Sequence, residues 1–136
     1  MTATDTDSIA IDQFISAPRE QVWATLTQPD LLARWWVPGD IAPVPGHRFH
    51  LQMPGRGAVA CQIVEVVPER LLTYTFNATW TLTWRLVAEG KGTRLLFEHS
   101  GFDLDQESER DAFQRMRPGW RDRVLPRLAQ LASSPA

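Results

Sequence analysis

The sequence contains a single cysteine, Cys61, which therefore has no partner for a disulfide within the chain. A chain without a disulfide framework is typical of a reducing compartment, so we expect a cytoplasmic protein. The neighbours of Cys61 are apolar, which favours a small buried side chain over a reactive thiol.

Long hydrophobic runs are also missing. No apolar stretch approaches the roughly 20 residues that a membrane-spanning helix needs. Residues 1–8 are polar and acidic and lack the apolar centre of a signal peptide. We therefore predict no membrane span. We expect residues 1–7 and the tail 133–136 to be disordered, and residues 8–132 to form one domain.

Basic residues are not in excess: 14 Lys and Arg face 16 Asp and Glu, for a net charge of −2. This balance argues against a nucleic-acid partner, which normally requires a basic face. The sequence has no glycine-rich phosphate loop and no serine nucleophile elbow. His47 and His50 are three residues apart, so on a strand they point to opposite faces and cannot share one metal ion. We expect no cofactor and no metal site.

Aromatic residues, in contrast, are abundant, with six Trp and six Phe. The C-terminal part carries apolar residues at intervals of three or four, which predicts one long helix over about residues 105–131. This apolar stripe consists of Phe113, Met116, Trp120, Val124, Leu128 and Leu131. Pro118 and Pro126 fall inside the helix on its far side, and we expect a bend near Pro118, or two helices there.

Before this helix the sequence alternates between apolar and polar residues, as strands do. Residues 9–15 form a first strand, and Pro18 and Pro29 mark the starts of two short helices. Alternating segments follow at 49–53, 58–67, 72–76, 80–86 and 95–99, joined by short turns that favour antiparallel neighbours. The prediction is an α+β fold. A curved antiparallel sheet of about six strands wraps around the C-terminal helix, with two short helices between strands 1 and 2.

Several local motifs occur in a familiar order: residues 17–23 (APREQVW), 29–38 (PDLLARWWVP), 64–71 (VEVVPERL), 92–95 (GTRL), 99–102 (HSGF) and 119–120 (GW). Together they resemble the START-like (SRPBCC) helix-grip superfamily. Within it, the chain is similar to the homologues of the activator of the heat-shock-protein-90 (Hsp90) ATPase. The match covers about residues 9–131. It departs from the family pattern at Pro45-Gly46-His47, where a Gly-Gly pair is common.

The resemblance implies a cavity between the sheet and the helix that holds a small apolar or aromatic molecule. One alternative is an enzyme of the cyclase, dehydratase or hydrolase type that uses the same cavity, with His99, Tyr74 or Arg117 as proton-transfer or oxyanion groups. Another is a module that interacts with an Hsp90-type chaperone. The eukaryotic co-chaperone carries an additional N-terminal domain, so activation of the ATPase is not inherited from the family name. We expect a monomer or a homodimer.

We predict no catalytic residue, but strand alternation and the helical stripe predict an aromatic-lined interior. The expected lining residues are Trp35, Phe49, Leu51, Met53, Tyr74, Phe76, Trp80, Trp84, Phe97, His99, Phe113, Met116, Arg117 and Trp120. The alternative is that these side chains close-pack and leave no void.

Two polar members of this set, Arg117 and His99, each have two interpretations. Arg117 either reaches inward to hold a carboxylate or phenolate, or extends to the surface. His99 either fixes the turn at Ser100-Gly101 or offers one hydrogen bond inside the cavity. Trp35 and Trp36 precede a proline-rich loop, where they would guard the entrance.

Overall fold

The computed structural model describes residues 8–134. The predicted disordered segment 1–7 and residues 135–136 of the predicted tail lie outside the described residues. Ser133 is the last residue of a helix, and the Ser134 hydroxyl donates a hydrogen bond to the carbonyl of Gln130. The hydrogen-bonded structure therefore extends beyond the predicted end of the domain at residue 132.

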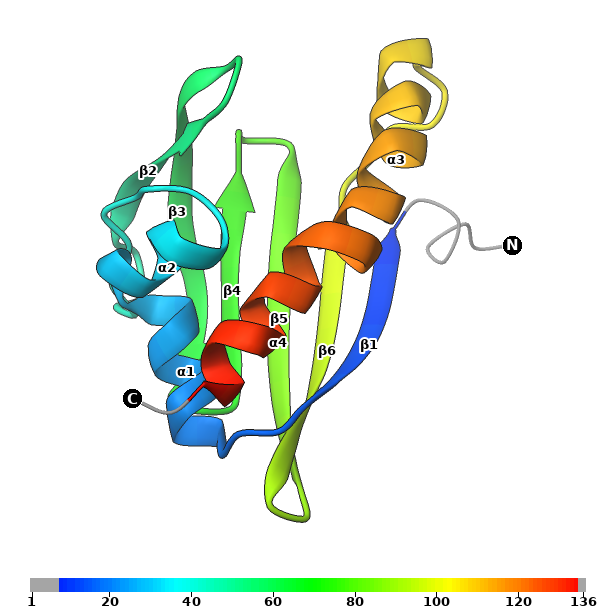
Figure 1. The fold of residues 1–136 in the computed structure, drawn as a ribbon. Helices are drawn as coiled ribbons and strands as arrows, with labels where there is room; N and C mark the ends of the chain where they lie inside the picture. Colours follow the sequence, from blue (N-terminus) through cyan, green and yellow to red (C-terminus); the bar gives the residue numbers. More distant parts are fainter. Residues whose placement is uncertain (1–7, 135–136) are drawn as a thin grey trace.

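One six-stranded antiparallel sheet forms the larger layer of the fold (Figure 1). Its strands are β1 (Ile9–Ile15), β2 (Arg48–Met53), β3 (Gly57–Val67), β4 (Leu71–Phe76), β5 (Trp80–Glu89) and β6 (Gly92–Ser100). The spatial order is β1-β6-β5-β4-β3-β2, so consecutive hairpins run from β2 to β6 and β1 closes the far edge. Because β2, β4 and β6 point the same way, their C-terminal ends meet at one end of the sheet.

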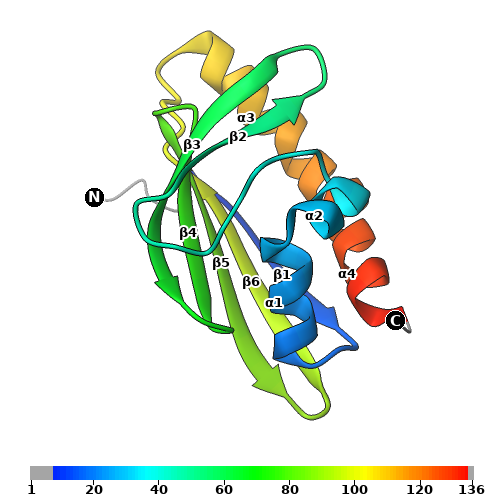
Figure 2. The same cartoon turned by 90° about the vertical axis from the view of Figure 1, so that its left-hand side faces the viewer.

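All helices lie on one side of the sheet, which curves around the longest of them (Figure 2). The helices α1 (Arg19–Thr27) and α2 (Pro29–Trp35) connect β1 to β2. The C-terminal helix consists of α3 (Glu107–Gly119), a π-helical turn η1 (Trp120–Val124) and α4 (Leu125–Ser133), and α4 contacts α1, α2 and β1. The predicted α+β helix-grip fold is confirmed. No helix in residues 8–134 is long and apolar enough to cross a membrane.

The C-terminal helix is not interrupted at Pro118, so the alternative of two helices divided there is wrong. Pro118 lies inside α3, and two residues further on the Trp120 N–H bonds to the carbonyls of Met116 and Arg117. The irregularity falls further on, where the Leu125 N–H donates to the Trp120 carbonyl five residues back. This wide turn immediately precedes Pro126, which has no N–H and falls in the first turn of α4, where none is needed.

The π-helical turn changes which residues of the helix face the sheet. The large side chains that are buried are those of Trp120, Leu125 and Leu128, with an interval of five between the first two. The predicted stripe, with an interval of four after Trp120, placed Val124 there instead of Leu125. Val124 is only half-buried. The extra residue in the wide turn thus shifts the buried face by one position.

The core is largest where the middle of the sheet meets the C-terminal helix. Trp35 and Trp84 are 1% and 0% exposed and meet edge to face, with ring centroids 5.7 Å apart.

Cys61 is also buried, as predicted, and burial raises the pKa of its thiol to about 12. A thiol with this pKa is inert at neutral pH.

Candidate functional site

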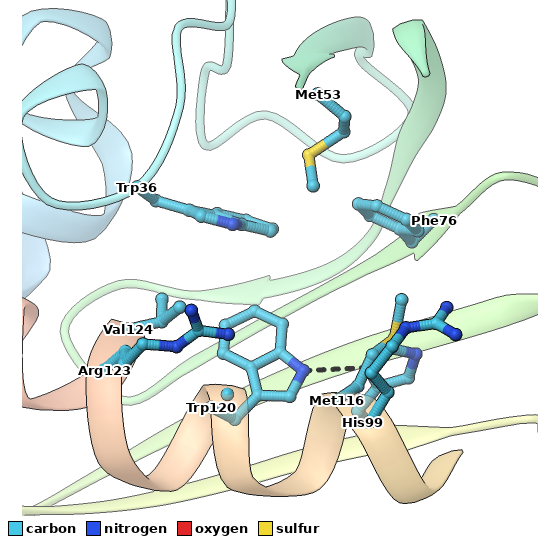
Figure 3. A pocket seen from close by; sticks show the side chains of 10 residues that line it. Trp36, Met53, Phe76, His99, Met116, Trp120, Arg123 and Val124 are labelled. Atoms are coloured by element: carbon cyan, nitrogen blue, oxygen red, sulfur yellow. Dashed lines mark hydrogen bonds between the residues drawn. The ribbon is translucent and has the colours of Figure 1, made fainter. Parts of the chain in front are cut away.

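A cavity of about 300 Å³ lies between the C-terminal helix and the end of the sheet where β2, β4 and β6 terminate. Its lining residues are Trp36, Met53, Phe76, His99, Arg115, Met116, Gly119, Trp120, Arg123 and Val124. Figure 3 shows Trp36, Met53 and Phe76 on one side of the cavity, facing the helical residues on the other. Met53 and Phe76 are the last residues of β2 and β4, and His99 is one residue from the end of β6.

Three aromatic rings form most of the apolar wall. The rings of Trp36 and Phe76 are nearly parallel, with an interplanar angle of 18° and centroids 6.1 Å apart. The indole of Trp120 lies 5.1 Å from that of Trp36 and is tilted by 57°. Met53 and Met116 complete the wall, and their unbranched thioether chains can adapt to a guest. This surface suits a flat apolar molecule, because offset or tilted ring contacts add to the gain from burial.

The two neighbouring tryptophans behave differently, and the prediction for Trp35 needs correction. Trp35 is the last residue of α2, and its indole N–H donates to the carbonyl of Thr25 at 2.8 Å within the core. Trp36 follows the helix with φ −132° and ψ −95°, and this non-helical backbone directs its half-buried ring to the cavity. Trp36, which we expected only as a guard of the entrance, is therefore a lining residue, and Trp35 is not.

His99 is the most enclosed polar residue of the cavity wall. It is 1% exposed, and its Nδ1 accepts a hydrogen bond from the Trp120 indole N–H at 3.1 Å. Because Nδ1 accepts, the neutral ring carries its proton on Nε2, which has no partner within residues 8–134. Burial lowers the pKa of His99 to about 3. Of its two ring nitrogens, Nδ1 is therefore used within the wall and Nε2 is enclosed, so the prediction that His99 offers a hydrogen bond inside the cavity stays a prediction.

Trp80, another predicted lining residue, supports the wall without reaching the cavity. Its ring stacks on Phe76 with centroids 5.8 Å apart and meets His99 edge to face at 4.9 Å. Its indole N–H donates to a carboxylate oxygen of Glu109 at 3.0 Å, which ties the start of α3 to the sheet. Trp80 therefore helps to fix the positions of Phe76 and His99.

Six further predicted residues pack away from the cavity. Of the described side chains, Phe49, Leu51, Tyr74, Trp84 and Phe97 are at most 2% exposed, and Phe113 packs against Phe102. Trp120 lies 5.9 Å from Trp84 and 4.4 Å from Phe97 between ring centroids, so the space between these residues is filled. For this half of the interior the close-packing alternative is correct. Burial also raises the pKa of Tyr74 far above its usual value, so its hydroxyl stays neutral.

The predicted arginine is replaced by two others. Arg117 is exposed and does not line the cavity, whereas Arg115 and Arg123 do. Arg115, Gly119 and Arg123 are spaced by four residues, so they lie along one edge of the helix. Because Gly119 has no side chain, the Arg123 guanidinium can lie over it, 3.4 Å from where a Cβ would be. Arg115 and Arg123 are two intervals of four apart, with Gly119 between them. This helical spacing was the signal in the sequence that could have identified the two arginines as a pair.

This arrangement is suited to binding more than to proton transfer. With a pKa of about 3, His99 is a weak base at neutral pH, and general bases work best with a pKa near the working pH. Tyr74 and Arg117, the other groups of the predicted enzymatic set, do not reach the cavity. The predicted lining residues that the structure brings together are Met53, Phe76, His99, Met116 and Trp120.

Comparison with solved structures identifies close relatives of this fold. Protein MLL2253 from Mesorhizobium loti is 31% identical, with a TM-score of 0.82 over 91% of this chain and 95% of that one. Protein BH1534 from Bacillus halodurans is also 31% identical, with a TM-score of 0.82 over 92% and 96%. The Aha1 dimer from Colwellia psychrerythraea shares the fold at 18% identity, with a TM-score of 0.80 over 93% and 96%. Comparison with curated proteins found no match.

The family model described as "Activator of Hsp90 ATPase homolog 1-like protein" matches residues 16–133. This range contains both short helices, five of the six strands and the whole C-terminal helix, including every lining residue of the cavity. The chain belongs to the family of activator of Hsp90 ATPase homolog 1-like proteins.

Proposed function

We propose that this protein binds a small, flat, apolar molecule in the cavity between Trp36, Phe76 and Trp120. The observation that carries the proposal is a partly open pocket of about 300 Å³ walled by three aromatic rings and two methionines. This volume is at the lower end of the range typical of small-molecule sites. It accommodates a molecule with two or three fused rings.

The experiment is a calorimetric titration with planar compounds of one to three rings, including 2-acetylnaphthalene. We expect saturable binding of at least one compound. The substitution Val124→Trp should abolish it, because the larger side chain fills the cavity from the π-helical turn. Val87→Trp is the matched control, since Val87 is 46% exposed on β5 and does not line the cavity.

Two results would contradict the proposal. Absence of saturable binding across the whole panel would leave the cavity without an apolar ligand. Equal binding by wild type and Val124→Trp would place the ligand elsewhere on the protein.

A further inference from the structure

The charged side chains of the cavity all have the same sign. Arg115 and Arg123 line it, and no aspartate or glutamate is among the lining residues. Within residues 8–134, neither guanidinium has a carboxylate oxygen within 4.0 Å. Of the nearby carboxylates, Asp122 pairs with Arg121 and Glu109 accepts from the indole of Trp80. Asp111, one helical turn before Arg115, forms no ion pair within 4.0 Å in residues 8–134. Two guanidinium groups at one opening thus have their hydrogen-bond donors free.

One deeper polar atom of the cavity wall is also a hydrogen-bond donor without a partner in residues 8–134. The Trp120 N–H is already used by His99, and this bond leaves the His99 Nε2–H as a buried donor without a partner. Buried donors without partners are rare in folded proteins, and an unmade bond of this kind costs free energy. Nε2 is enclosed in this structure, so an acceptor reaches it only when a covering side chain moves. The cavity therefore favours a guest with acceptor oxygens over one with donors.

Resting on the proposed function, we propose that the ligand is an aromatic carboxylate, with its rings against the wall formed by Trp36, Phe76 and Trp120 and its carboxylate on Arg115 and Arg123. A guanidinium matches the geometry of a carboxylate with two parallel hydrogen bonds, and an aromatic acid presents that group in the plane of its rings. Arg123 reaches from the helix toward the cavity beside Trp120 (Figure 3).

The test compares two probes of similar shape, 2-naphthoate and 2-acetylnaphthalene, by calorimetry at neutral pH. Both carry a carbonyl oxygen on the same ring system, but only the first is an anion. Apolar burial alone would favour the ketone. We expect 2-naphthoate to bind about tenfold more tightly, because each exposed ion pair contributes up to about a fivefold gain. High salt should reduce this preference, because the arginines are exposed.

The variants assign the preference to the arginines. Arg115→Met combined with Arg123→Met should remove the preference, so that the ratio of the two affinities falls to about one or below, because the variant has no cation left at the cavity to pair with the carboxylate. Arg117→Met is the matched control, since Arg117 is exposed on the same helix outside the cavity. It should leave both affinities unchanged.

The outcomes separate this inference from the proposed function. Equal affinity of the wild type for the two probes overturns the aromatic acid and leaves the binding cavity standing. A preference that survives the double substitution, or is lost in Arg117→Met, also overturns it. Failure of both probes to bind overturns this inference, and the proposed function is overturned as well when the rest of the panel also fails to bind.

Discussion

The space between the sheet and the C-terminal helix has two halves that are built from the same residue types. One half is filled by side chains, and the other contains the cavity. Around Trp84 the aromatic rings interlock, and Trp35, Phe97 and Trp120 leave no gap. One residue further along the chain, Trp36 lines a hollow that it shares with the other face of Trp120. Aromatic composition therefore does not decide whether an interior is filled. Whether the interior is filled depends on where the strands end and on where a helix changes which of its residues face the sheet.

The largest expected effect separates the filled half from the hollow one. Trp84→Ala should lower the free energy of unfolding by about 3–5 kcal/mol, because it leaves a large void in a fully buried position. Trp36→Ala, in a half-buried position beside existing space, should cost no more than about 2 kcal/mol. Urea denaturation of both variants measures the difference. Similar losses in the two variants would show that the filled half is not tightly packed.

Acid should weaken the boundary between the two halves, where His99 lies. The unfolded chain takes up a proton at His99 below about pH 6.5, whereas the folded chain does so only near pH 3. The free energy of unfolding should therefore fall by up to about 1.4 kcal/mol per pH unit across this window, or about 2–3 kcal/mol from pH 6.5 to 4.5. The groups packed on His99 are the rings of Phe76, Trp80, Phe102 and Trp120.

The control for this pH effect is His99→Phe, measured by urea denaturation at each pH. Carboxylates elsewhere also titrate in this range, so the informative quantity is the difference between wild type and variant. The free energy of unfolding of the wild type minus that of His99→Phe should fall by about 2–3 kcal/mol from pH 6.5 to 4.5. A difference that stays constant from pH 6.5 to 4.5 would mean that His99 is not buried as a neutral ring.

The smallest expected effect is at the edge of the hollow half. Gly119 has helical angles, φ −61° and ψ −46°, and an added Cβ would meet only the movable end of Arg123. Gly119→Ala should therefore raise the free energy of unfolding by about 0.5–1 kcal/mol, the usual gain for this change inside a helix. Thermal denaturation provides the measurement.

Gly101→Ala is the opposite case and serves as the control. Gly101 has φ +97°, and an added Cβ would clash with the carbonyl oxygen of Thr79, so this change should destabilise the protein. Stabilisation by Gly101→Ala, or a loss in Gly119→Ala, would contradict the backbone described for these two positions.

Much of the fold follows from local patterns in the sequence. The strand predicted over residues 9–15 is β1, in which Ile9 and Ile15 are 1% exposed and Phe14, on the other face, is 41% exposed. The proline-marked starts of α1 and α2 and the antiparallel hairpins were also predictable, because they depend on neighbours in the chain. Within the candidate site, the same reasoning identified Met53, Phe76, His99, Met116 and Trp120.

The sequence by itself determined which residues share a face of each strand and helix, because side-chain direction follows the period of the element. Only the tertiary structure decided which of those faces are filled. The π-helical turn moved Leu125 inward and left Val124 at the cavity, and the end of α2 separated Trp36 from Trp35. These outcomes depend on how elements remote in the chain pack together, and local periodicity carries no information about the space left between them.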